Sequence, residues 1–198
     1  MKLAAVTVVV LVTSAFALSP AWADSDGHVN FFIGQKSLDS DDWDPVDDQL
    51  EFGAVMSFGQ DDWPVHIAVD VLASAAEETV FDPFLGDVTV TGSTFEIAGG
   101  VRKIWGKGMF RPYLGAGVAV IGAGAELDDG FVSVDANEVG FGFWAGGGLF
   151  WRLGKHFNIG LDARYSSAEV DLDFGSGIVS QDVSAGGLHY GLLVGFGW

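Results

Sequence analysis

Serine, histidine and aspartate side chains in the first half of the chain have types and spacings that could support hydrolysis. Ser57, His66 and Asp70 fall on the same face of two neighbouring predicted strands, and folding the chain about the turn between them brings Ser57 roughly opposite His66. In a Ser-His-Asp site the histidine takes the serine proton while the carboxylate orients the imidazole. These residues define a candidate hydrolase. The competing interpretation is a set of ordinary polar residues inside a folded domain.

A second group of candidate residues is a cluster of aspartates in segment 39–48. The side chains of Asp39, Asp41, Asp42 and Asp44 could supply oxygen ligands to a metal ion. Clustered carboxylates suit Ca²⁺ or Mg²⁺, although the spacing departs from that of an EF-hand loop. The alternatives are a solvated loop whose charges repel one another and a weak divalent site. We expect no cofactor.

A third group consists of charged residues that alternate with apolar ones along predicted strands. Its members are Lys36, Glu51, Asp70, Glu96, Arg102, Asp162 and Arg164. The positive and negative charges nearly balance, and charges removed from water must be paired and hydrogen-bonded. The pattern predicts an ion-pair network that closes a narrow lumen. A gated path for ions or small solutes is the alternative.

The composition excludes several classes of protein. The chain has 198 residues, a net charge of −18 and no cysteine. Such a charge repels nucleic-acid phosphates, and a chain without cysteine has no disulfides or thiolate ligands. An apolar fraction of 49% argues against disorder. The mean hydropathy of +0.34 is unusual for so acidic a chain, so the apolar and acidic residues must occupy different surfaces.

The first 23 residues have the order of a secretory signal peptide. Lys2 precedes an apolar run over 3–18, and Pro20 is followed by the small-residue site Ala21-Trp22-Ala23. We expect cleavage after Ala23 and one mature domain over 24–198. A retained membrane helix is the alternative, but the run is short for a bilayer.

The mature segment has the two-residue period of β-strands. Alternating apolar positions predict eight strands, which run through 29–33, 50–58, 65–73, 95–101, 114–120, 139–151, 157–165 and 188–198. The first of these is short. We expect it to pair with the eighth, because a sheet in lipid must close on itself to satisfy its backbone groups.

The links between the predicted strands alternate in length and charge. Short links follow strands two, four and six. The longer links after strands one, three, five and seven hold 19 of the 27 acids, in segments 39–48, 77–87, 126–138 and 169–182, and these segments contain no Lys or Arg. Short turns at one end and long loops at the other are typical of outer-membrane barrels. The predicted fold is therefore all-β: an eight-stranded antiparallel up-and-down transmembrane β-barrel, with mobile acidic loops facing outside.

Tryptophans gather at the short-turn end. Trp63, Trp105, Trp151 and Trp198 fall at or beside the short turns or the C-terminus. Amphipathic indole rings favour the membrane–water interface. These residues are predicted to form an aromatic girdle on the periplasmic side.

The last eleven residues, LHYGLLVGFGW, carry an apolar residue at every second position and close on an aromatic one. In this the chain resembles the small eight-stranded outer-membrane barrels of Gram-negative bacteria, the OmpA-like and opacity-type family. The resemblance covers the whole mature chain and implies that Tyr190, Leu192, Val194, Phe196 and Trp198 form the signal read by the barrel-assembly machinery. The chain stops at the last predicted strand, so no peptidoglycan-binding domain is expected.

These observations predict a non-enzymatic, monomeric outer-membrane protein with a structural or surface-interaction role. Its expected partners are outer-membrane lipid, lipopolysaccharide and the assembly machinery, with divalent cations as a further candidate and nucleic acid excluded. A narrow channel is the first alternative function. A lipid A-modifying hydrolase is the second, although the family's His-x-Ser pattern is absent around Tyr165-Ser166-Ser167.

Overall fold

The computed structural model describes residues 25–60, 62–83, 86–106, 108–128, 133–172 and 181–198. The predicted signal peptide over 1–23 lies outside these ranges and stays a prediction. Among the described residues, no helix has the length and apolar character needed to cross a membrane.

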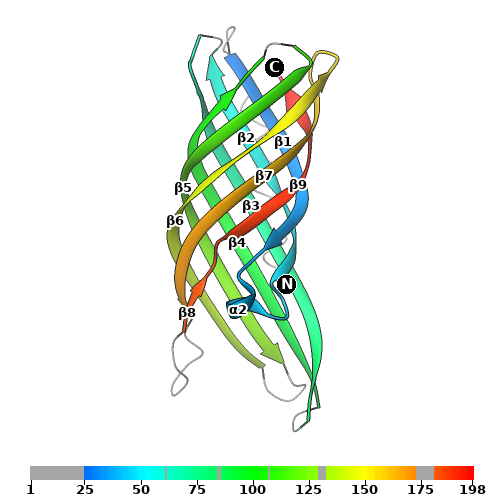
Figure 1. Cartoon of the computed structure of the whole chain (residues 1–198), viewed down its shortest axis with the longest axis vertical. Coiled ribbons are helices and arrows are strands. Elements are labelled where there is room, and N and C mark those ends of the chain that lie inside the picture. Colours follow the sequence, from blue (N-terminus) through cyan, green and yellow to red (C-terminus); the bar gives the residue numbers. More distant parts are fainter. Residues whose placement is uncertain (1–24, 61, 84–85, 107, 129–132, 173–180) are drawn as a thin grey trace.

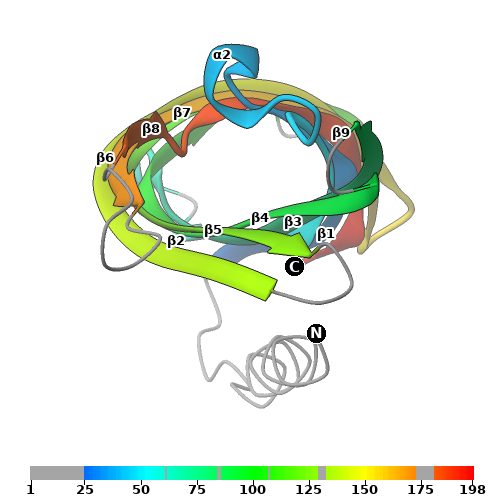
Figure 2. The same ribbon diagram turned by 90° about the horizontal axis from the view of Figure 1, so that it is seen from below.

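Nearly all of the described chain is β-strand. The strands are β1 (Ser25–Ser37), β2 (Asp48–Gln60), β3 (His66–Asp82), β4 (Gly86–Ile104), β5 (Phe110–Asp128), β6 (Ser133–Leu153), β7 (Phe157–Leu172), β8 (Gln181–Ser184) and β9 (Gly187–Gly197), with a short helix α2 (Ser40–Trp43). Strands β1 to β7 each pair antiparallel with the next, β7 pairs with both β8 and β9, and β9 pairs with β1. The sheet closes into a ring (Figures 1 and 2). The predicted eight-stranded antiparallel barrel is confirmed, with β8 and β9 together forming the eighth strand.

The alternation seen in the sequence separates two surfaces of the barrel. On β4, Glu96 and Ala98 are buried in the interior while Ile97 and Val101 are exposed on the outside. The same inversion recurs around the ring, so the exposed outer face is apolar and much of the buried interior is polar. A water-soluble domain has the opposite arrangement, because it hides its apolar face.

The first and eighth strands differ from their predicted extents. β1 has 13 residues rather than the short run over 29–33, and it pairs with β9 from His28↔Gly197 to Ser37↔Leu188. The eighth strand is interrupted at residues 185–186, between β8 and β9. Beyond Ser37 the eighth strand has no strand partner on the β1 side among the described residues.

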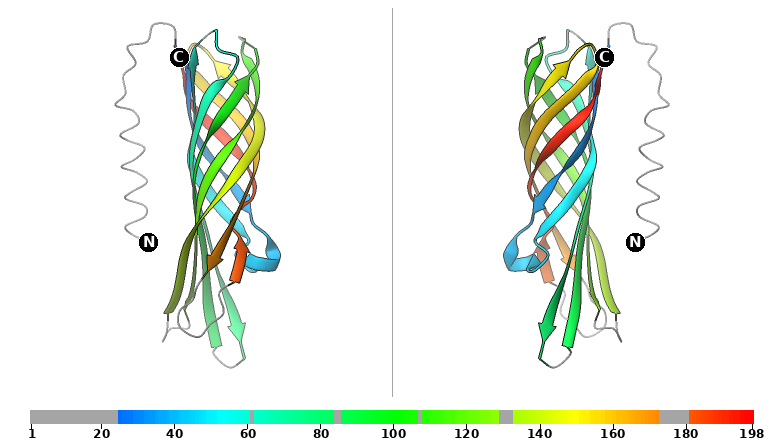
Figure 3. Two further views of the ribbon diagram at one scale, coloured as in Figure 1. Left: turned by 90° about the vertical axis from the view of Figure 1, so that its left-hand side faces the viewer. Right: turned by 90° about the vertical axis from the view of Figure 1, so that its right-hand side faces the viewer.

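Several acids of the long links lie in strands, which corrects the expectation that these links are loops throughout. Their mobility stays a prediction. Glu77 and Glu78 lie within β3, and Glu126 lies within β5. The ladders continue outward, with Thr79 paired to Thr89 and their hydroxyls 3.4 Å apart. Figure 3 shows the β3–β4 and β5–β6 hairpins projecting beyond the closed part of the barrel. Alternating Thr and Val residues sustain the pairing there despite the charge.

Aromatic rings cluster at the short-turn end. Three ring pairs have centroids 6.0–6.4 Å apart: Phe110–Trp151, Phe157–Phe196 and Phe58–Trp198. Trp63 and Trp105 lie at the turns after β2 and β4 and are exposed. Trp198 also exchanges two backbone hydrogen bonds with Gly27, which tie the C-terminus to β1.

Candidate functional site

A network of ion pairs occupies the middle of the lumen. Both Arg102 and Arg164 contact one oxygen of Asp70, at 2.8 Å and 3.0 Å. Arg164 also lies 3.4 Å from Asp162 and 3.9 Å from Glu96. All five side chains are at least nine-tenths buried. We call these five residues the central network. It joins strands β3, β4 and β7 across the interior.

Aromatic and polar neighbours hold the two arginines in place. The Trp144 ring lies 5.6 Å from the Arg102 guanidinium and 5.2 Å from that of Arg164. Arg102 also donates to the Ser57 hydroxyl at 2.9 Å. Tyr113 donates a hydrogen bond to Asp162. Stacking and hydrogen bonds of this kind are what make buried guanidinium groups tolerable. The arrangement fixes side chains across the lumen.

Two other predicted network residues, Lys36 and Glu51, lie nearer the hairpin end and have different partners. Lys36 Nζ donates to Thr94 Oγ1 and to the Ala185 carbonyl, both at 2.9 Å. Glu51 contacts His189 Nδ1 at 2.9 Å, and His189 Nε2 lies 2.8 Å from the Ser166 hydroxyl. All these side chains are buried.

The chain Ser166–His189–Glu51 has the connectivity of a nucleophile, base and orienting acid. Ser166 and His189 are both 0% exposed, however, so no surface of either side chain is open to a substrate. A catalytic serine must reach a substrate carbonyl. In this conformation the three groups therefore act as a buried hydrogen-bond relay that fixes β2, β7 and β9 relative to one another.

A further polar cluster lies inside the barrel near the short turns. Asp26 lies 3.3 Å from His66, 3.6 Å from His28 and 3.8 Å from Arg111. Arg152 Nη2 lies 3.1 Å from His28 Nδ1. These contacts join β1, β3, β5 and β6 at the base of the barrel.

At the opposite end, the link between β1 and β2 lies at the rim of the barrel and sends apolar side chains into its interior. Leu38, Trp43 and Val46 are buried and pack in one cluster with apolar residues of the barrel wall. We call residues 38–47 the plug. Trp43 Nε1 donates to the Ser184 carbonyl at 2.8 Å, and Asp42 accepts from the Ser184 N–H at 2.9 Å. Side chains of α2 thus take the place of the missing strand partner beside β8. Figure 2 shows α2 at this rim.

The predicted Ser57, His66 and Asp70 arrangement is not assembled. The register pairs Ser57 with Ala68, not with His66. Ser57 instead accepts from Arg102, His66 contacts Asp26, and Asp70 binds the two arginines. The alternating pattern placed all three residues on inward faces, but a two-residue difference in register separates the serine from the histidine.

The aspartates of the plug also have structural partners. Asp39 caps α2 by accepting from the Asp41 N–H at 3.1 Å, and Asp42 binds Ser184. Asp44 follows the helix at its C-cap. Within the described ranges, no three His, Cys, Asp or Glu side chains come together as a metal site. Weak divalent binding by this segment stays a prediction.

Several interior residues that make these contacts were not predicted as members of the charge network. His189, Tyr113 and Trp144 lie at inward positions of the alternating pattern, so their side of the sheet could be predicted. Their partners could not, because Glu51 and His189 are 138 residues apart. Only the closed ring brings such distant positions together.

Solved structures provide the comparison for this geometry. No protein-family model matches the sequence, and no curated protein matches it either. The attachment invasion protein Ail of Yersinia pestis, solved with the heparin analogue sucrose octasulfate, aligns with a TM-score of 0.59 at 13% identity, covering 88% of this chain and 99% of Ail.

Two further solved structures also align with most of this chain. OprG of Pseudomonas aeruginosa aligns with a TM-score of 0.56 at 15% identity, over 88% of this chain and 96% of OprG. A major outer membrane protein of Thermus thermophilus aligns with a TM-score of 0.54 at 10% identity, over 88% of this chain and 98% of that protein. The chain has the fold of the small outer-membrane β-barrels. At sequence identities this low, the structural similarity supports only the fold. The function must be argued from the residues of this chain.

Proposed function

We propose that this protein is a non-enzymatic barrel of the Gram-negative outer membrane with a closed lumen and a structural or surface-interaction role. In this proposal the acidic hairpin end faces outside and the aromatic end faces the periplasm. The observation that supports it is that two sets of side chains fill the interior in series: the apolar residues of the plug and the ion pairs of the central network.

The outer surface supports the membrane location. Large apolar side chains stand exposed around the ring, such as Ile97 on β4, Phe143 on β6 and Leu161 on β7. In water such a continuous apolar surface would make the protein associate. In a membrane the same surface contacts the lipid chains. The aromatic pairs at the short-turn end lie where a membrane interface would place them.

The lumen supports a closed barrel rather than a pore. Side chains fill the interior of an eight-stranded barrel, and here many of them are charged and mutually bound. Moving an ion through the central network would require Asp70 to release two guanidinium groups, both of them buried. Breaking a buried pair is costly because it leaves an uncompensated charge.

The charge distribution supports a selective outer surface. In the part of the chain that the structure describes, the Lys and Arg residues lie in the lumen or near the short turns, and the described residues of the projecting hairpins include acids but no Lys or Arg. That end repels anionic polymers. A surface role would therefore engage neutral or cationic partners, in contrast to Ail, which was solved with a sulfated sugar. The remaining proposed partners are membrane lipid, lipopolysaccharide and, through β9, the assembly machinery, with the protein acting as a monomer.

Single-channel recording in planar bilayers tests the closed lumen. The wild type should show no conductance steps. Trp43→Ala, which weakens the plug, should also stay silent because the central network lies behind it. Combining Trp43→Ala with Asp70→Ala should give steps, and Trp43→Ala with Glu78→Ala should not. Regular steps from the wild type would instead establish the narrow-channel alternative.

The hydrolase alternative has its own test. Lipid A from cells that overexpress the protein should have the same mass spectrum as lipid A from cells expressing Ser166→Ala. Loss of an acyl chain that depends on Ser166 would contradict a non-enzymatic role.

A further inference from the structure

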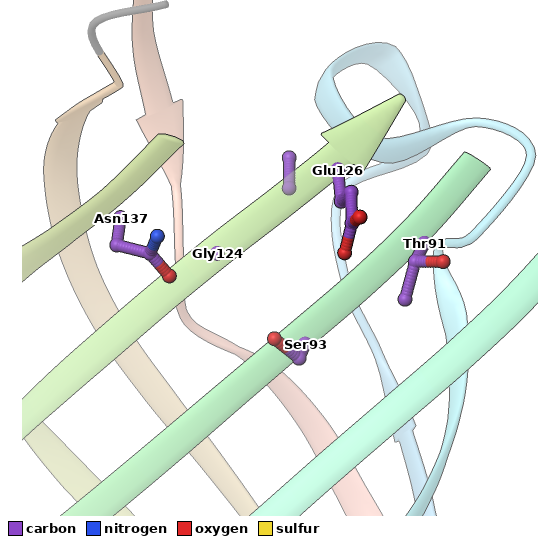
Figure 4. A pocket seen from close by; sticks show the side chains of 6 residues that line it. Thr91, Ser93, Gly124, Glu126 and Asn137 are labelled. Atoms are coloured by element: carbon purple, nitrogen blue, oxygen red, sulfur yellow. The ribbon is translucent and has the colours of Figure 1, made fainter. Parts of the chain in front are cut away.

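A polar hollow opens on the outer face of the barrel, between β4, β5 and β6. Its volume is about 260 Å³ and its lining comprises Thr91, Ser93, Gly124, Ala125, Glu126 and Asn137. Register places Ser93 beside Gly124 and Gly124 beside Asn137, so one row of the sheet crosses the hollow. Figure 4 shows the side chains of Ser93 and Asn137 on the strands that flank Gly124, with Thr91 and Glu126 farther along.

The hollow lies where the outer face changes from apolar to polar. The next row toward the short turns contains Phe95 and Val139, and the row after it contains Phe141, which is 82% exposed. The next row toward the hairpin tips contains Thr91 and Glu126. The hollow therefore sits at the boundary between the apolar belt and the polar hairpins, the level of lipid headgroups in the proposed membrane location.

The lining groups favour a neutral, hydroxyl-rich ligand. Hydroxyl groups of Thr91 and Ser93 can donate and accept, the Asn137 amide can do both, and the Glu126 carboxylate accepts. The lining contains no Lys or Arg. A phosphate placed there would be repelled by the Glu126 carboxylate. A sugar ring, with hydroxyls that both donate and accept, matches these groups.

Gly124 makes the hollow possible. A Cβ at this position would lie 2.6 Å from Asn137 Oδ1 and 3.3 Å from Ser93 Oγ. A side chain there would occupy the floor and displace the Asn137 amide. Gly99 lies on the same outer face of β4, where an added Cβ would meet nothing within 4 Å. The two glycines therefore provide a matched pair for substitution.

We infer that this hollow binds the sugar headgroup of a glycolipid in the outer leaflet. The ring hydroxyls would bond with Ser93, Glu126 and Asn137, while the acyl chains would lie along Val139 and Phe141. The inference rests on the proposed membrane location. It adds a ligand site on the lipid-facing surface, separate from the lumen.

The test uses the barrel reconstituted in phosphatidylcholine nanodiscs with a fluorescent monoglucosyl diacylglycerol as the probe. The heat-dependent shift in gel mobility is measured first, because it reports whether the barrel has folded and inserted. A failure to insert would contradict the proposed membrane location, whereas it would not test binding in the hollow. In folded samples, Gly124→Val and Asn137→Ala should each weaken retention of the probe about tenfold. Gly99→Val should retain it as the wild type does.

Two competitors identify the source of the sugar. Competition by free methyl glucoside would show that the sugar is recognised without its lipid. Competition by unlabelled glucosyl lipid alone would show that the membrane-anchored headgroup is the ligand. Either result supports the site. Equal retention by the wild type and Gly124→Val, or equally tight retention of a labelled phosphatidylglycerol, would overturn it.

Discussion

The barrel body and its projecting hairpins share one alternating pattern but meet different surroundings. Strand β3 passes through both regions. Asp70 and Glu78 lie an even number of residues apart and so face the same side of the strand, yet Asp70 is buried between two arginines whereas Glu78 is exposed. On outer faces, Phe143 stands in the apolar belt, while Phe81 stands near a hairpin tip and is 75% exposed.

The comparison shows that closure of the sheet decides whether an inward-facing side chain is buried or exposed to water. Within the ring, inward positions are cut off from solvent, and the charges of the central network have neighbours of opposite sign. Beyond the ring, the same inward positions reach water and tolerate acids without cations. Substitutions of the same type in the two regions should therefore have very different effects.

The largest difference is expected between Asp70→Ala and Glu78→Ala. Removing Asp70 leaves Arg102 and Arg164 without their shared carboxylate, which should lower the free energy of unfolding by about 3–5 kcal/mol. Glu78→Ala removes an exposed charge and should change it by less than about 0.5 kcal/mol. Urea unfolding in lipid vesicles, followed by tryptophan fluorescence, measures both. Similar values for the two variants would contradict the buried network.

A smaller difference is expected between two exposed phenylalanines. Phe143→Arg puts a cation near the middle of the belt and should cost about 2–4 kcal/mol in vesicles. Phe81→Arg lies outside the belt and should be nearly neutral. The same vesicle assay compares the two variants. A neutral Phe143→Arg would mean that this face does not contact lipid.

The smallest effect is expected for the indole side chain of the C-terminal residue, Trp198. Trp198→Ala removes the contact with Phe58, whose ring centroid is 6.4 Å away, while the chain can keep its backbone bonds to Gly27. Aromatic pairs contribute about 1 kcal/mol, so the free energy of unfolding should fall by that amount. Assembly in cells should fall further, because the residue also belongs to the proposed assembly signal. Phe58→Ala is the matched control, since it removes the same contact and leaves the C-terminus intact.

Much of this architecture could be predicted from local pattern. Alternation at Phe95, Ile97 and Val101 places a strand and its outward face without knowledge of its neighbours. The acidic hairpins were expected to be loops because charge usually marks solvated links. Pairing such as Thr79 with Thr89 is a cross-strand property that one strand does not reveal.

The plug and the relay could not be predicted, for a related reason. Trp43 is buried because β1 stops at Ser37 while β8 continues, which leaves Ser184 to be bound by side chains of α2. The partnership of Glu51 with His189 depends on closure of the ring between β1 and β9. Both features arise from geometry between segments distant in the sequence.

The central claim is that the barrel spans the outer membrane with its hairpins outside, and single-cysteine labelling tests it most directly. The chain contains no cysteine, so Glu78→Cys, Phe143→Cys and Lys155→Cys each introduce one thiol. A membrane-impermeant maleimide added to intact cells should label position 78 alone. After the outer membrane is disrupted, position 155 should be labelled too, and position 143 should remain protected by lipid. Labelling of position 155 but not 78 on intact cells, or ready labelling of position 143, would contradict the account.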